Sequence, residues 1–132
     1  MPVYSTGLLE NRAGSSGIRP SQKLVLRVSN EGVYSTDCLV EIFTLNNKDQ
    51  TKHQNFYITQ FALNGVNKTG AVRTFDDIEC NLDTFGVRVT TIGTGSANVA
   101  VTMFTMDANG NLVDSHRAFQ GEMQLVGVDL IL

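Results

Sequence analysis

The sequence contains no tryptophan, only two prolines and a small share of charged residues. Its 132 residues carry 10 Lys and Arg against 13 Asp and Glu, which gives a net charge of −3. A protein that binds nucleic acid or anionic lipid gathers basic side chains on one face, because the partner's phosphates must be neutralised. Here the basic residues are scattered along the chain. We therefore expect neither a nucleic-acid partner nor a membrane partner.

Long apolar runs are also missing. No segment approaches the roughly 18 consecutive apolar residues that a membrane-spanning helix needs. Residues 1–7 lack the basic region and the apolar region of a secretory signal peptide. We expect a protein that is made in the cytoplasm without a signal peptide. A final location on a spore or virion surface would then follow cell lysis.

Helical periodicity is absent as well. No stretch of a dozen residues repeats apolar side chains every three to four positions, whereas apolar and polar residues alternate in short runs between Gly, Asn and Asp. About eight such runs predict an all-β protein, an antiparallel β-sandwich of jelly-roll type. The immunoglobulin variant is disfavoured, because no Trp stands between the two cysteines.

The expected strands follow from these runs. They cover residues 3–9, 23–30, 40–42, 53–63, 85–90, 98–106, 112–119 and 123–132. Asn109-Gly110 lies between two of them and predicts a hairpin, because both residue types tolerate positive φ. The apolar end Leu130-Ile131-Leu132 predicts a last strand that is paired and buried.

The first 22 residues differ from the rest. A strand-forming segment is followed by residues 11–17, Asn-Arg-Ala-Gly-Ser-Ser-Gly, whose composition is that of a flexible linker. We therefore divide the chain into an N-terminal arm with its linker, residues 1–22, and a sandwich domain, residues 23–132. Residues 3–9 form either the first strand of the same sandwich or an arm that pairs with a neighbouring subunit.

Four apolar side chains of the arm are the candidate anchors of such an interface. They are Val3, Tyr4, Leu8 and Leu9. Each would contribute roughly 1.5–3 kcal/mol if it were fully buried in the neighbour.

Cys38 and Cys80 are the only cysteines. In a reducing compartment Cys packs as a small hydrophobe, so we favour two buried free thiols over a single disulfide within or between subunits. Two thiols cannot hold a structural zinc ion, and neither His53 nor His116 lies at a ligand spacing from them.

Several motifs resemble catalytic or metal sites without meeting their requirements. Asp114-Ser115-His116 has the residue types of a hydrolase triad, but neighbouring side chains of a strand point to opposite faces. The run 107–111 lacks the glycine and glutamate positions of an EF-hand and is explained by a turn. We predict no catalytic residue, no metal ligand and no cofactor, and expect a protein that is not an enzyme.

The densest acidic patch comprises Asp76, Asp77, Glu79 and Asp83. It could bind a cation on a loop. We favour a solvated loop that shields a sheet edge.

Carbohydrate binding is the first alternative function. Sandwich modules of this kind stack sugars on exposed aromatic rings, and the candidates here are Tyr4, Tyr34 and Tyr57. A shallow groove lined by Tyr34 or Tyr57 would support it.

The chain also resembles a family. Residues 11–20, 23–30, 41–45 and 107–113, together with His116-Arg117, are similar to small β proteins of spore-forming Firmicutes. In size and strand content the chain distantly resembles the subunits of endospore appendage fibres. The resemblance implies a jelly-roll subunit whose N-terminal arm docks into the next subunit of a filament.

One departure from that family limits the mechanism. The fibre subunits carry arm cysteines for crosslinks, whereas residues 1–37 here contain no cysteine. Only strand pairing or packing could then join subunits. We accordingly expect a self-assembling structural protein that pairs with copies of itself and with an anchoring surface protein. A phage virion component is a further alternative.

Overall fold

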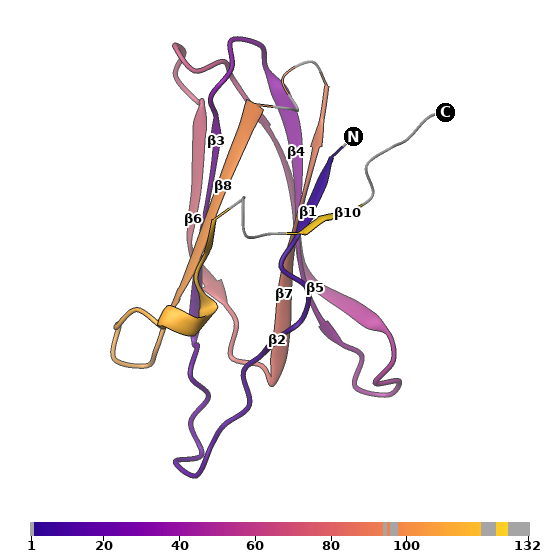
Figure 1. The fold of residues 1–132 in the computed structure, drawn as a ribbon, viewed down its shortest axis with the longest axis vertical. Coiled ribbons are helices and arrows are strands. Elements are labelled where there is room, and N and C mark those ends of the chain that lie inside the picture. The colour runs from indigo at the N-terminus through magenta and orange to yellow at the C-terminus, as the bar shows by residue number, and fades with distance from the viewer. Residues whose placement is uncertain (1, 94, 96–97, 120–123, 127–132) are drawn as a thin grey trace.

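The protein is an antiparallel β-sandwich, seen in a computed structural model in which two sheets face each other (Figure 1). The structure describes residues 2–93, 95, 98–119 and 124–126. Every strand pairing in these ranges is antiparallel. The all-β sandwich predicted from the alternating pattern is confirmed.

Each sheet draws its strands from distant parts of the chain. The larger sheet comprises β1 (Val3–Ser5), β2 (Leu9–Glu10), β4 (Thr36–Leu45), β5 (His53–Leu63), β7 (Thr84–Ile92) and β10 (Gln124–Val126). Its strand order is β10-β1-β7-β4-β5, and β2 also pairs with β7. The smaller sheet comprises β3 (Lys23–Asn30), β6 (Val72–Glu79), β8 (Val99–Met106) and β9 (Ala118–Phe119), in the order β6-β3-β8-β9. A short 3-10 helix, η2 (Asp114–His116), precedes β9.

Most consecutive strands lie in opposite sheets, so the chain crosses the sandwich repeatedly. Strand β3 pairs with β8. Strands β4 and β7, which lie between β3 and β8 in the sequence, pair with each other in the other sheet. This nested pairing is compatible with a jelly roll. It also leaves β5 and β6 as edge strands of the two sheets.

The core lies between the sheets and is made of alternate side chains. In β8, Val99, Val101 and Met103 are buried, while the residues between them are half-exposed. Phe85, Val87 and Val89 of β7 pack against this layer from the larger sheet. A period of two follows directly from the pleat of a strand, which is why the sequence pattern identified these elements.

The N-terminal residues belong to the larger sheet of the same chain. Strand β1 pairs with β7 on one side and with β10 on the other, and β2 pairs with β7. Tyr4 and Leu9 pack against the core. The sequence allowed residues 3–9 to pair either within their own sandwich or with a neighbouring subunit. In the single chain they pair within their own sandwich.

Two local predictions are wrong. Three residues of the acidic patch, Asp76, Asp77 and Glu79, lie in the second half of strand β6 and not in a loop; Asp83 lies in the β6–β7 connection. An edge strand that buries only Ile78 and part of Phe75 lacks the alternation that would reveal it. Its charges nevertheless lie on a sheet edge, where they hinder pairing with another chain.

The expected strand over residues 112–119 is also interrupted. Met106 and Leu112 form a bridge and β8 pairs with β9, but η2 lies between these contacts. In the preceding turn Gly110 has φ 81°, whereas Asn109 keeps a negative φ. The Asp107 carboxylate accepts hydrogen bonds from the Asn109 and Asn111 amides, which supports this turn. The predicted burial of residues 130–132 falls outside the described residues.

Candidate functional site

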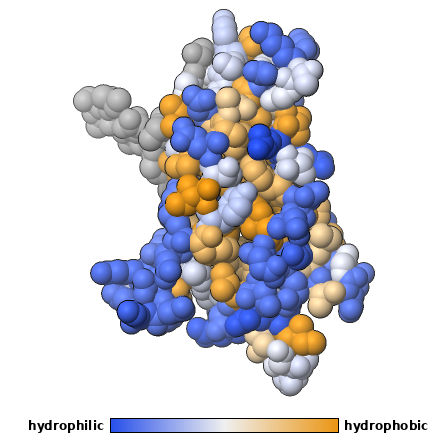
Figure 2. All heavy atoms as spheres, turned by 180° about the vertical axis from the view of Figure 1, so that it is seen from behind, coloured by the Kyte–Doolittle hydropathy of each residue, from blue (hydrophilic) through white to orange (hydrophobic). Residues whose placement is uncertain are grey.

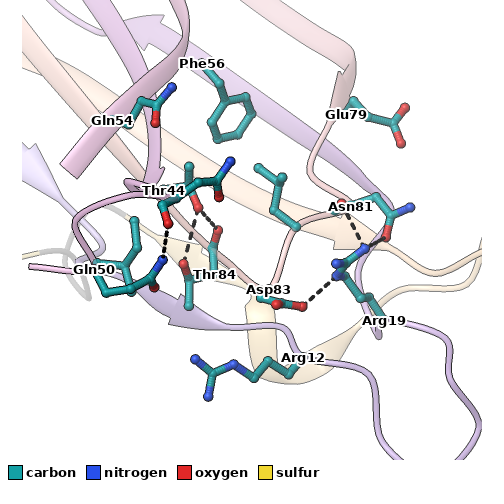
Figure 3. Close-up of a pocket in the computed structure, with 13 residues that line it drawn as sticks. Arg12, Arg19, Thr44, Gln50, Gln54, Phe56, Glu79, Asn81, Asp83 and Thr84 are labelled. Atoms are coloured by element: carbon teal, nitrogen blue, oxygen red, sulfur yellow. Dashed lines mark hydrogen bonds and ion pairs between the residues drawn. The ribbon is translucent and has the colours of Figure 1, made fainter. Parts of the chain in front are cut away.

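A pocket of about 430 Å³ opens at one end of the sandwich (Figure 3). It is formed by the β4–β5 turn and adjoining strand residues, the β6–β7 connection and the segment that follows β2. A volume of this size lies within the usual range of small-molecule sites, about 300–1,000 Å³. The pocket is therefore the first place to look for a ligand.

Phe56 supplies the aromatic side chain of the pocket. Ile42 pairs with Tyr57 and Phe43 pairs with Asn55, so Phe56 has no opposite residue in β4. Such a bulge turns a side chain away from the regular alternation, and bulges are common beside functional sites. Phe56 is 38% exposed, and its ring makes no ring or cation contact with the described residues.

Amide and hydroxyl groups surround this ring. The Gln54 amide makes no hydrogen bond to any described residue, and it lines the pocket beside Phe56 (Figure 3). Gln50 donates from Nε2 to the Asn46 carbonyl at 2.9 Å, which leaves its Oε1 uncommitted. Thr44 donates to the Thr84 carbonyl at 2.7 Å and so joins the ends of β4 and β7. Donors and acceptors for a polar ligand are thus both present.

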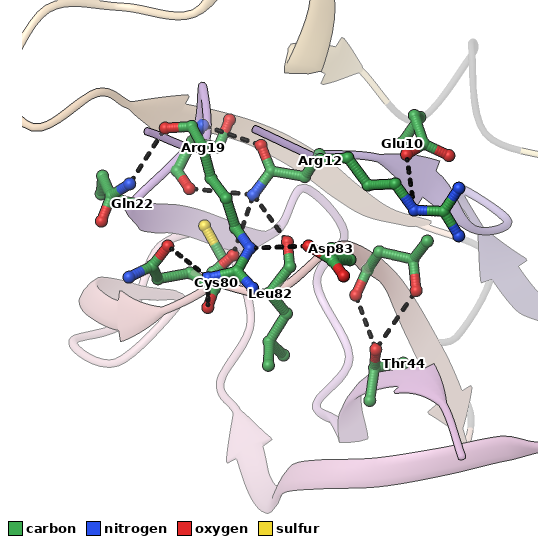
Figure 4. Close-up of polar contacts among 12 residues, drawn as sticks. Glu10, Arg12, Arg19, Gln22, Thr44, Cys80, Leu82 and Asp83 are labelled. Atoms are coloured by element: carbon green, nitrogen blue, oxygen red, sulfur yellow. Dashed lines mark hydrogen bonds and ion pairs between the residues drawn. The ribbon is translucent and has the colours of Figure 1, made fainter. Parts of the chain in front are cut away.

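The charged side chains of the pocket are paired. Arg19 donates from Nε to the Asp83 carboxylate at 2.9 Å and from Nη1 to the Asn81 side chain at 3.2 Å. Arg12 lies 3.5 Å from the Glu10 carboxylate (Figure 4). Glu10, Arg12 and Asp83 are more than half exposed and Arg19 is partly exposed, so each pair contributes little stability but holds the two guanidinium groups at the rim.

A buried amide fixes one wall of the pocket. Asn11 is 1% exposed and donates from Nδ2 to the carbonyls of Ser21, Cys80 and Leu82 at 2.9, 3.2 and 2.9 Å. Its Oδ1 accepts a hydrogen bond from the Ser21 amide at 2.8 Å. The residue therefore joins the segment after β2 to the β6–β7 connection that lines the pocket.

His116 belongs to a buried polar cluster rather than to a triad. Its Nδ1 lies 2.5 Å from the Ser21 hydroxyl and its Nε2 lies 2.8 Å from the Glu10 carbonyl. The Ser21 hydroxyl also contacts Thr105 at 2.6 Å and is fully buried, so no substrate can reach it. Ser115 is exposed, and within the described part of the chain its side chain makes no hydrogen bond to His116. The cluster holds the N-terminal segment against β8 and η2.

Both cysteines are free thiols in the hydrophobic core. Burial raises the pKa of the Cys38 thiol to about 11 and that of Cys80 to about 12, because the thiolate would lose its hydration. The thiolate is the reactive form, so both groups are protected at neutral pH.

This protection predicts the outcome of thiol labelling. Iodoacetamide at pH 8 should modify neither Cys38 nor Cys80 of the native protein, since both side chains are buried and protonated. The same treatment in guanidinium chloride should modify both, as counted by intact-mass spectrometry. Rapid modification of the native chain would contradict the burial of these thiols.

The four candidate interface side chains have different surroundings. Tyr4 and Leu9 pack on the core, Val3 is half-buried, and Leu8 is exposed. Tyr4 and Leu9 thus both lie on the inner side of the larger sheet, while Leu8 points to solvent.

Two of the tyrosines expected for sugar stacking are accessible, Tyr57 in a groove and Tyr34 in an exposed connection. Tyr57 does line an open groove of about 370 Å³ between β5 and β6. Arg73 covers the neighbouring rings of Phe61 and Phe75 at 5.5 and 5.6 Å, and Tyr57 meets Phe75 edge-on. Tyr34 is exposed in the β3–β4 connection.

No group of three or more potential metal ligands occurs among the described residues. Within the same ranges, no helix has the length and apolar character needed to cross a membrane.

The pocket residues were not predicted from the sequence. Asn46, Asn47, Gln50, Gln54 and Asn55 form a local excess of amides around the β4–β5 turn, and this excess was the one available signal. The bulge at Phe56 has no sequence signature of its own.

The chain matches no protein-family model, and no curated protein or solved structure is significantly similar to it.

Proposed function

We propose that the protein is a non-enzymatic structural subunit that assembles with copies of itself by β-strand pairing. The observation that carries this proposal is the edge strand β5. Its eleven residues contain no Asp, Glu, Lys, Arg or Pro. Soluble proteins usually place such residues on their edges, because a bare edge pairs with other chains.

The outer part of β5 is also regular and partly apolar. Its pairing with β4 runs from Tyr57 to Leu63 without a register shift, and Ile58 is 59% exposed. The edge strand β6 differs, since it carries Arg73, Asp76, Asp77 and Glu79. Viewed from behind, the molecule shows an interrupted band of apolar side chains between hydrophilic margins (Figure 2). A second copy of β5 is the simplest occupant of this edge.

The N-terminal strand offers a second connection between copies. Strand β1 is only three residues long and lies between β7 and β10, so a neighbour's β1 could fill the same position. Residues 12–18 form an exposed loop that could serve as the hinge. In such an exchange Val3, Tyr4 and Leu9 would anchor the arm in the next subunit, whereas Leu8 would remain at the surface. A fibre, shell or surface layer on a spore or virion is the assembly that the family resemblance suggests.

A charge on the β5 edge tests the proposal. In multi-angle light scattering the wild-type chain should show a mass that rises with concentration, and Ile58→Lys should shift it to the monomer. The introduced ammonium group would lie opposite Glu41, so the subunit itself should remain stable. Val72→Lys is the matched control, because Val72 is 51% exposed on β6 and the charge change is the same.

The outcomes separate the two connections. If Ile58→Lys keeps the wild-type mass but a chain lacking residues 1–10 is a folded monomer, the arm joins the subunits. If the wild-type chain is a monomer at every concentration, the structural function is wrong.

A further inference from the structure

We infer that the end pocket binds a neutral saccharide of one or two rings, through the open face of Phe56, the uncommitted amide of Gln54 and the free Oε1 of Gln50. This inference goes beyond the assembly function and does not depend on it.

The aromatic ring suits the apolar side of a sugar. An aromatic face is electron-rich and attracts the weakly positive C–H groups that cover one side of a sugar ring. Phe56 has this face available, because the bulge places the ring at the pocket and no described ring or cation covers it. In the Tyr57 groove, Arg73 lies over the Phe75 ring, and Tyr57 meets that ring edge-on.

The polar groups suit hydroxyl groups. An amide side chain presents a donor and an acceptor side by side, which matches a pair of neighbouring sugar hydroxyls. Gln54 has both groups uncommitted, and Gln50 retains its Oε1. The Oδ1 of Asn81 accepts a hydrogen bond from Arg19, and the Nδ2 of Asn81 can donate to a ligand. Few, well-placed polar groups around an apolar surface are typical of small-molecule sites.

The charges indicate a neutral ligand. Within the described part of the chain, each charged side chain that lines the pocket has a partner of opposite charge: Arg12 with Glu10, Arg19 with Asp83, and Glu79 with Lys23. An anionic or cationic ligand would have to displace one of these pairs. A saccharide without charge binds without disturbing them.

The test uses saturation-transfer difference NMR on the full-length protein. The probes are glucose, galactose, N-acetylglucosamine, maltose, lactose and chitobiose, with galacturonic acid as the charged probe. At least one neutral sugar should bind. Phe56→Ala should raise the Kd of that sugar about tenfold, which corresponds to a loss of about 1.4 kcal/mol of binding free energy. Phe56→Tyr should retain it, because the ring face is kept.

Gln54→Ala has a matched control. Gln60 is an exposed amide on the same strand that does not line the pocket. Gln54→Ala should weaken binding severalfold, whereas Gln60→Ala should leave it unchanged. Thermal melting of each variant shows whether its fold is intact.

Three outcomes would overturn the inference. They are no binding of any neutral sugar, binding of galacturonic acid alone, and binding that both Phe56→Ala and Gln54→Ala leave intact. The NMR binding experiment is repeated with the Ile58→Lys variant, which is expected to be a monomer. Because Ile58 lies outside the pocket, this variant reports sugar binding without assembly.

Discussion

Replacing Asn11 with alanine is expected to lower the free energy of unfolding by about 4 kcal/mol. The side chain donates to three main-chain carbonyls, those of Ser21, Cys80 and Leu82, and accepts from the Ser21 amide. A buried polar group left without its partner costs about 1–3 kcal/mol, and alanine leaves several such groups at once. Urea denaturation followed by circular dichroism measures this loss. The midpoint of thermal unfolding should fall by roughly 10–15 °C.

Asn55→Ala is the control for this substitution. Asn55 is exposed, and among the described residues its side chain donates only to the Glu41 carboxylate, at 3.0 Å. The stability of that variant should stay within about 0.5 kcal/mol of the wild type. If Asn11→Ala were equally mild, Asn11 would not join the N-terminal segment to the β6–β7 connection in solution. The arm would then be less firmly attached than the structure shows.

Gly86→Ala is expected to prevent the chain from reaching its native fold or to destabilise it by more than about 4 kcal/mol. A Cβ at this position would lie 2.4 Å from the Gly7 carbonyl oxygen and 2.5 Å from Cζ of Phe43. Gly86 is in strand β7, which has neighbours on both sides, so the backbone cannot move away. The soluble yield, the circular dichroism spectrum and the thermal midpoint report the effect.

Gly14→Ala separates this clash from a general effect of losing glycine. A Cβ added at Gly14 would meet no heavy atom within 4 Å beyond its chain neighbours, and the residue lies in the exposed segment after β2. Its replacement should leave the thermal midpoint within a few degrees of the wild type. A Gly86→Ala protein as stable as the wild type would mean that the segment around Gly7 does not lie against β7. The N-terminal arm would then be loosely attached, which would favour its exchange between subunits.

The alternating pattern predicted the elements that line the core. In β3 and β8 one face is buried and the other is more open, so the period of two appears in the sequence. It failed at β6, because an edge strand with two exposed faces has no reason to alternate. It also failed at η2, where a single turn of 3-10 helix is too short to show a period.

The candidate site could not be predicted in the same way. Arg12, Gln54 and Asp83 lie far apart in the sequence and meet only at the end of the sandwich. Within the run 114–116, His116 is hydrogen-bonded to Ser21 and Glu10 instead of to its sequence neighbours. Proximity along the chain was a poor guide here, because chain crossings between the sheets decide which side chains meet.

The sequence by itself determined the all-β class, the antiparallel sandwich and most of its core, because burial of one strand face imposes a local period that any reader of the chain can detect. Tertiary structure alone decided that β1 lies between β7 and β10, that β5 is a bare edge, and that Phe56 turns toward a pocket. These features depend on pairing between segments that are distant in the chain. Pairing of that kind is set by the packing of the whole sandwich, and no local pattern encodes it.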